Sequence, residues 1–142
     1  YRPVATKARD YLFGWLDHLL LCAALPDGVA PVTQWLSNDG RFEFAPVENA
    51  REHLATLLRG YRLGLASPLH FYPKSAWARV FGTDAAKAWH VTPQKPYGEE
   101  GDPYYRLALR GVADPLDGEF EAWAAAVFGP LREHLRDSRL KA

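Results

Sequence analysis

The sequence contains no methionine and only one cysteine, Cys22, in 142 residues. A single cysteine excludes an internal disulfide and a zinc site built from several cysteines. Cys22 lies in an apolar run of helical character, where a small and unreactive side chain is the simplest interpretation. A chain without disulfides is typical of a reducing compartment, so we expect a cytoplasmic location. Because the chain begins at Tyr1 and has no methionine, we predict that it is a piece of a longer protein.

An excess of charge and a long hydrophobic run are also missing. Lys and Arg total 17, and Asp and Glu total 17. Without a net field to concentrate a polyanion, the chain is not expected to be a stand-alone nucleic-acid binder. The apolar run at residues 19–25 is too short to span a bilayer, and it follows Asp17 and His18 rather than a basic leader. We therefore predict no membrane association and no export.

Motifs that carry common chemistries are absent as well. The chain has no phosphate-binding loop for ATP and no Gly-x-Ser-x-Gly nucleophile elbow. The histidines are scattered without metal-ligand spacing, and they are His18, His53, His70, His90 and His134. The sequence therefore predicts no catalytic residue and no metal site.

What is present suits one packed domain covering residues 1–142. Apolar residues make up 48% of the chain and aromatic residues 13%. A chain of this length buries roughly two-thirds of the surface that its unfolded form exposes. The number of large rings exceeds what a minimal core needs, so we expect some of them to face a partner.

Hydrophobic periodicity predicts several helices. The predicted helices cover residues 4–25, 48–65, 74–81, 84–89 capped by Thr83, 102–110 opened by Pro103, and 117–138 interrupted at Gly129-Pro130. On the second helix, Gly60 and Gly64 predict the close approach of another element. The last helix has a long apolar stripe, part of which we expect a neighbouring domain to cover.

Between residues 32 and 47 the period changes from helical to alternating, which predicts a β-hairpin. Asn38-Asp39-Gly40 would supply the positive-φ residues of its turn. A lone hairpin is marginal in water, so it must pack on helices or join a sheet. The predicted fold class is therefore α+β, dominated by helices, with a small hairpin or sheet packed on them.

Two short motifs occur in a fixed order that no generic amphipathic pattern requires. The first is Phe71-Tyr72-Pro73-Lys74-Ser75-Ala76-Trp77, and the second is Asp102-Pro103-Tyr104-Tyr105-Arg106. Together with the segments at residues 15–23, 57–61, 107–111 and 119–124, they resemble the C-terminal domain of RecC, the gamma subunit of exodeoxyribonuclease V. We interpret Pro73, Lys74, Ser75 and Trp77, with residues 102–106, as family-signature residues that serve packing.

The resemblance implies a fold related to nucleases that bind magnesium through an Asp and an Asp/Glu-x-Lys pair. The hairpin offers Asp39 and Glu43, but Ala45 stands where the lysine would be, and no acid precedes any lysine by two positions. We therefore interpret Glu43 as a solvated residue of a strand. We therefore expect a degenerate nuclease-like domain with no catalytic residue, metal or cofactor of its own, while the parent complex uses ATP and magnesium through other subunits.

The resemblance also implies partners. The parent protein would join RecB-like and RecD-like subunits in an ATP-dependent helicase-nuclease that prepares DNA double-strand breaks for recombination. Its gamma subunit guides the separated strands and recognises the Chi sequence. This domain would dock RecD and would meet DNA only through the full complex.

Lys74 and Arg106 are the candidate DNA-binding residues, since each is flanked by aromatic residues. The alternative for Lys74 is a structural role over the rings or in an ion pair with Asp102, and for Arg106 a structural ion pair. Two other functions stay open. The first is an active metal-dependent nuclease, which cleavage of DNA abolished by Glu43→Ala would identify. The second is a helical protein adaptor unrelated to DNA repair.

Overall fold

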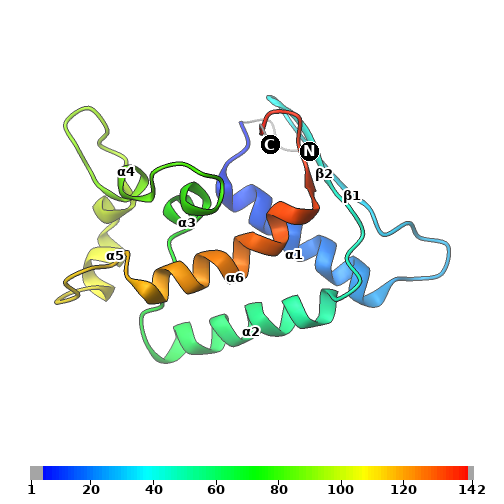
Figure 1. Cartoon of the computed structure of the whole chain (residues 1–142), viewed down its shortest axis with the longest axis horizontal. Coiled ribbons are helices and arrows are strands. Elements are labelled where there is room, and N and C mark those ends of the chain that lie inside the picture. The colour runs from blue at the N-terminus through cyan, green and yellow to red at the C-terminus, as the bar shows by residue number, and fades with distance from the viewer. Residues whose placement is uncertain (1–4, 141–142) are drawn as a thin grey trace. The chain divides into compact units, whose positions relative to one another are not determined.

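The computed structural model describes residues 5–140, in which six α-helices, one 3-10 helix and three strands follow one another (Figure 1). The elements are α1 (Ala8–Ala24), β1 (Thr33–Ser37), β2 (Gly40–Phe44), α2 (Ala50–Ala66), α3 (Pro73–Val80), α4 (Ala85–Trp89), η1 (Glu99–Gly101), α5 (Pro103–Ala108), α6 (Gly118–His134) and β3 (Leu135–Arg136). This composition confirms the α+β class. No helix within the described range is long and apolar enough to cross a membrane.

The structure divides into two compact units. The first contains the residues up to Leu57 together with those from Pro130 onward, and the second contains Leu58–Gly129. The division falls within α2 and within α6, so the second unit is inserted in sequence between two segments of the first.

The first unit begins with α1, which the apolar periodicity predicted. The Asp10 carboxylate accepts a hydrogen bond from the Lys7 amide (2.8 Å) and so satisfies one donor at the start of the helix. The helix ends at Leu25, whose φ of 32° is left-handed and whose amide donates to the Leu21 carbonyl (2.7 Å). The predicted start at Val4 lies outside the described residues, and the helix proper begins at Ala8.

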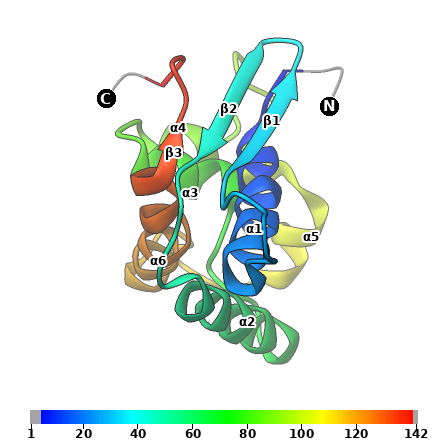
Figure 2. The same ribbon diagram turned by 90° about the vertical axis from the view of Figure 1, so that its right-hand side faces the viewer.

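The hairpin prediction is confirmed, and the hairpin packs beside α1 (Figure 2). Ser37 pairs with Gly40, so Asn38 and Asp39 form a two-residue turn. Of the residues predicted to supply positive φ values in this turn, Gly40 does so, at φ 137°, and Asn38 and Asp39 do not. The Thr6 and Ser37 side chains bond the Asp39 carboxylate and hold the turn without two left-handed residues.

A third strand completes the sheet in the order β1-β2-β3, all antiparallel. β3 pairs Leu135 with Phe44 and Arg136 with Glu43, so the last helix ends at His134. The prediction that this helix would run to Ser138 was therefore wrong. The backbone leaves the helix because it gains strand partners on β2.

A cluster of rings forms the core of the first unit. Trp15 is fully buried, with its ring centroid 5.3 Å from Phe44 and 5.7 Å from His134. On the same side of the sheet, Phe42 lies 4.5 Å from Tyr11. Alternation along β2 places both phenylalanines on the helix side, as the period-two pattern predicted.

His18 is completely buried beside this cluster. Its Nδ1 lies 3.0 Å from Thr33 Oγ1 and its Nε2 lies 2.9 Å from the carbonyl of Ala45, which suits a neutral ring that donates from Nε2. Burial lowers the pKa of His18 below 6.5, and the neighbouring His134 lowers it further, although the bond to Ala45 opposes the shift. The folded state therefore disfavours the imidazolium.

We expect the free energy of unfolding to fall as the pH drops below 6.5. Since the pKa of His18 is lower in the folded than in the unfolded state, the unfolded state binds the proton first as the pH falls from 6.5. Urea denaturation at a series of pH values measures this. His90→Gln, at an exposed position, should keep the dependence, and His18→Gln should reduce it. A flat profile in the unchanged protein would contradict the assignment.

The second unit is helical. Gly60 meets the Trp123 ring, which would lie 3.0 Å from an added Cβ, so the predicted close approach is confirmed there. At Gly64 an added Cβ would make only an ordinary contact with Leu69, so no other element approaches this glycine as closely as Trp123 approaches Gly60. Helix α4 is capped by the Asp84 side chain, which accepts from the amides of Ala86 and Lys87, and not by Thr83 as predicted.

The apolar stripe of α6 is buried by the chain itself. Its buried members are Phe120, Ala124, Val127, Phe128, Leu131 and Leu135. Rings of the second unit such as Phe71 and Trp77 pack on Phe128 (5.8 and 5.6 Å between centroids). Trp123 of the same stripe is half-buried, so the cover of part of the stripe by a neighbouring domain stays a prediction.

Candidate functional site

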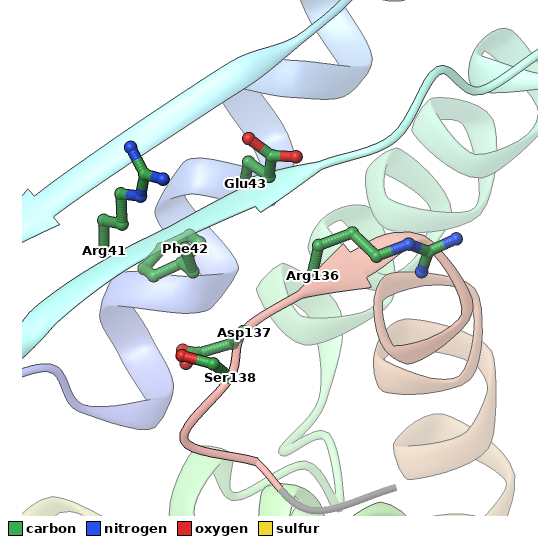
Figure 3. Close-up of a pocket in the computed structure, with 6 residues that line it drawn as sticks. All are labelled: Arg41, Phe42, Glu43, Arg136, Asp137 and Ser138. Atoms are coloured by element: carbon green, nitrogen blue, oxygen red, sulfur yellow. The ribbon is translucent and has the colours of Figure 1, made fainter.

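A shallow hollow of about 420 Å³ lies along the sheet in the first unit (Figure 3). Strand β2 contributes Arg41, Phe42 and Glu43, and the segment around β3 contributes Arg136, Asp137 and Ser138. It brings Glu43, considered above as a possible metal ligand, near a second carboxylate. A cation could bind in this hollow only if the two carboxylates point toward the same place.

The carboxylates of the hollow do not converge. Glu43 and Asp137 point in different directions (Figure 3), and Glu43 stands opposite Arg136 in the register of the sheet and accepts from Gln34 Nε2 (3.3 Å). Asp39, the other candidate, is at the hairpin turn. Within residues 5–140 no group of three His, Cys, Asp or Glu side chains is placed to hold a metal ion.

Asp137 instead belongs to a polar network that fixes the end of the chain on the hairpin and α1. Its carboxylate has no exposed surface and accepts from Arg139 Nε (2.8 Å), Arg139 Nη2 (2.6 Å) and Tyr11 Oη (2.7 Å). Arg139 Nη1 reaches Asp39 at 2.9 Å. This network is therefore the place where residues 137–139 are attached to the first unit.

The pKa values of the network follow from these contacts. Burial alone would raise the pKa of Asp137, but the hydrogen bonds from Arg139 and Tyr11 outweigh it and hold the value below its usual range. Burial and the bond to Asp137 raise the pKa of Tyr11. Hydrogen bonds from Ser37 and then Thr6 lower the pKa of Asp39. All three groups therefore keep their usual charge states at neutral pH.

In the second unit, Glu99 caps the helix that starts in the first signature motif, and it lies three residues before the second motif. This buried carboxylate accepts from the amide of Lys74 (3.0 Å) and from both the amide and the hydroxyl of Ser75 (2.7 Å each). It therefore caps the start of α3, where free amides and the helix dipole favour a negative charge. Pro73 occupies the first turn of the helix, a position where its missing N–H costs nothing.

Rings around Tyr72 join the same elements. The Tyr72 ring lies 4.3 Å from Trp89, 5.2 Å from Tyr105 and 5.8 Å from Phe120. Its hydroxyl is buried without a hydrogen-bond partner, and burial followed by the nearby charge of Asp117 raises its pKa. Burial likewise raises the pKa of Tyr105 to about 12. Tyr72 and Tyr105, one from each signature motif, therefore meet Trp89 in a packed junction between α3, α4 and α5.

The two candidate DNA-binding residues are both exposed. Lys74 does not pair with Asp102, as one interpretation held, because its Nζ donates to the carbonyl of Tyr97 (3.2 Å). The Asp102 carboxylate accepts from the Tyr104 amide (2.8 Å) and caps α5. Among the ion pairs of residues 5–140, none involves Arg106, so the ion pair predicted for it is absent there.

Large apolar side chains are exposed on α1. Phe13 (59% exposed), Leu16 and Leu20 (53% exposed) follow at intervals of three and four residues, so they share one face of the helix. We call these three residues the α1 stripe. The opposite face carries Trp15 and Leu19, which are buried. Helix α1 is therefore apolar on two sides, only one of which the described chain covers.

Comparison with known protein families shows to which family this chain belongs. A model of the RecC C-terminal domain matches residues 1–81, which is more than half of the chain. The chain belongs to the RecC C-terminal domain family. The RecBCD enzyme subunit RecC of Escherichia coli (strain K12) is 34% identical over 84 residues, which cover 56% of this chain and 7% of that protein. The chain thus corresponds to a small part of that relative, which is named as a subunit of the RecBCD enzyme.

The family match divides the sites described above. It includes the α1 stripe, the hairpin and the first signature motif at the start of α3. The second motif, Glu99 and the polar network around Asp137 and Arg139 lie beyond residue 81. Sequence reasoning missed Glu99 and Asp137 as buried carboxylates. An acid beside a glycine was the only local signal for Glu99, and such a pair is common in loops.

Proposed function

We propose that this chain is a non-catalytic assembly domain of a RecC-like subunit and that its α1 stripe docks a RecD-like subunit. The observation that carries the proposal is the exposed apolar face of α1 within the family-matched segment. Contiguous exposed apolar side chains at helical spacing are typical of protein interaction sites. The relative in E. coli is named as a subunit of an enzyme, so its family works in an assembly.

The proposal of a non-catalytic role is supported by Glu43, Asp137 and Asp39, because each of these carboxylates is hydrogen-bonded to side chains of the protein. Glu43 accepts from Gln34, Asp137 is bonded to Arg139 and Tyr11, and Asp39 is bonded to Ser37, Thr6 and Arg139. A magnesium ion needs carboxylate oxygens that converge on one point. Ala45 also occupies the position of the lysine expected in the Glu-x-Lys pair.

We infer further that the scaffold is a degenerate nuclease-like fold. The described part offers a three-stranded antiparallel sheet against α1 as support. In this proposal, ATP hydrolysis and magnesium chemistry belong to other subunits, a RecB-like subunit is a further partner, and the assembly works in the cytoplasm on broken DNA.

A co-precipitation experiment tests the docking role. The 142-residue chain should capture a RecD-like subunit, and Leu20→Asp should weaken capture at least tenfold, because truncation or charging of a central interface residue costs about 1 to 2 kcal/mol or more. Biolayer interferometry gives the dissociation constants. The helix should remain folded, since the Leu20 side chain makes no part of the core.

Leu65→Asp is the matched control, because Leu65 is an exposed leucine on another helix, α2. It should leave capture unchanged. If a folded chain fails to bind the RecD-like subunit, the docking proposal is wrong. If Leu65→Asp weakens binding as much as Leu20→Asp, the α1 stripe is not the contact.

A further inference from the structure

Large apolar side chains are exposed along the end of α2, in the second unit. Leu58 is 50% exposed, Tyr61 is 65% exposed and Leu65 is 71% exposed. They follow at intervals of three and four residues, so they share one face of the helix. Gly60 lies on nearly the opposite side of the helix, where an added Cβ would meet the Trp123 ring of α6 at 3.0 Å. The apolar row therefore lies away from the side of α2 that packs on α6.

Two arginines accompany this apolar row. Arg62 lies four residues after Leu58 and so shares its face, and Arg59 lies at the border. Both arginines are exposed, and neither takes part in the ion pairs of residues 5–140. The sequence has no Asp or Glu from residue 53 to residue 83. We call the surface formed by Leu58, Arg59, Tyr61, Arg62 and Leu65 the α2 face. It is apolar at its centre and cationic at its edge.

We propose that the α2 face binds an amphipathic helix of another protein, one whose apolar row is flanked by Asp and Glu side chains. Apolar side chains at helical spacing pack on the apolar row of a second helix. Acids beside that row would pair with Arg59 and Arg62, for which their own segment of the chain offers no acid. The proposal does not depend on docking by the α1 stripe, because the two surfaces lie on different helices.

Other occupants fit this surface less well. A second copy of the chain would bring the same two arginines together with no acid between them, and like charges at an interface disfavour binding. A nucleic acid would find phosphate contacts only at the edge, because Leu58 and Leu65 offer no hydrogen-bond donor to a phosphate. Charge and apolar surface together therefore favour an acidic helix.

Fluorescence anisotropy of two labelled helical peptides tests the proposal. Both peptides have about 18 residues, or about five helical turns, and carry leucines along one face. One peptide has glutamates beside the leucines, and the other has lysines there. The glutamate peptide should bind the 142-residue chain, and the lysine peptide should bind about tenfold more weakly, because like charges then face each other.

Two variants locate the contact. Leu65→Asp should weaken binding of the glutamate peptide about tenfold or more, because it places a charge in the apolar row. Arg62→Glu should weaken binding of the glutamate peptide and strengthen binding of the lysine peptide, since it reverses a charge on the α2 face. A variant that had lost its fold would not bind either peptide more tightly, so this exchange separates lost contacts from lost folding.

Leu20→Asp and Arg110→Glu are matched controls, because they change an exposed leucine on α1 and an exposed arginine of the second unit. They should leave both dissociation constants unchanged. The proposal is overturned if the glutamate peptide does not bind, if the two peptides bind equally well, or if Arg62→Glu does not reverse their order.

Three further measurements would reveal a different occupant, and each such result would overturn the proposal. Sedimentation of the unchanged chain should show a monomer, whereas a dimer that Leu65→Asp dissociates would identify a second copy. A single-stranded oligonucleotide should not displace the glutamate peptide, whereas displacement would identify a nucleic acid. The peptide should also bind a longer RecC-like subunit that contains this chain. Loss of binding there would show that the subunit itself covers the α2 face.

The same variants separate this proposal from the docking role. Leu65→Asp should lose the peptide and still capture a RecD-like subunit, and Leu20→Asp should do the reverse. If a RecD-like subunit displaces the glutamate peptide, the α2 face belongs to the docking surface for that subunit, and the proposal of a separate partner is wrong.

Discussion

Replacing Glu99 with alanine is expected to lower the free energy of unfolding by about 3 to 5 kcal/mol. The change leaves the amides of Lys74 and Ser75 and the Ser75 hydroxyl without their acceptor. Ser75 is completely buried, so water does not replace the lost bonds without opening the junction. An unsatisfied buried donor costs about 1 to 3 kcal/mol, and the three losses are not fully additive because they share one carboxylate.

Urea denaturation followed by circular dichroism measures this change, and hydrogen exchange at the Lys74 and Ser75 amides locates it. Glu99→Gln should lose less, since the amide oxygen still accepts while the charge at the helix start is removed. Glu119→Ala is the control, because Glu119 is an exposed acid in the same unit. An unfolding free energy for Glu99→Ala within 1 kcal/mol of the unchanged chain would contradict the capping role.

Asp137→Ala should destabilise the chain by about 2 to 3 kcal/mol. The substitution removes the acceptor for Arg139 and for the Tyr11 hydroxyl, and it leaves Arg139 with Asp39 as its remaining acid. Removing one partner of a fully buried ion pair costs about 3 to 5 kcal/mol, and the effect is smaller here because Arg139 keeps some exposure to water.

Thermal and urea denaturation measure the loss, and hydrogen exchange should show weaker protection of the amides in β3. Glu43→Gln provides a matched control, because it removes the charge of an acid on the same sheet that accepts a hydrogen bond from Gln34 on the neighbouring strand. Because the amide oxygen of glutamine can still accept this bond, the free energy of unfolding should change by less than about 1 kcal/mol. Equal effects of the two substitutions would show that the network around Asp137 does not hold the C-terminal segment.

Features with local signals were predictable from the sequence. Helix α1, the hairpin and the proline-started helix α3 all follow from periodicity or turn residues within one short segment. The placement of Glu43 on the side of β2 opposite the buried Phe42 and Phe44, where it is half-buried, also follows from alternation along the strand. The resemblance to the RecC C-terminal domain rested on such short segments, and the family match confirms it for residues 1–81.

Features that depend on distant partners were not predictable. Leu131 and Leu135 continue the helical spacing of α6, yet Leu135 pairs with Phe44 on β2 and belongs to a strand. Glu99 caps helix α3 by accepting from the amide of Lys74, which lies 25 residues earlier in the sequence. In both cases the local pattern permits several structures, and a contact made only in the folded chain selects one.

The pairing of β2 with β3 has a kinetic consequence. Glu43 meets Arg136 only after the whole inserted second unit has been synthesised, so the sheet of the first unit cannot close while the ribosome is still producing residues 58–129. Long-range pairing of this kind slows folding, because the conformational entropy of a large loop is lost before the stabilising contacts between its ends have formed. Until then the second edge of the hairpin is open to other chains, which makes the nascent protein a natural client for a chaperone.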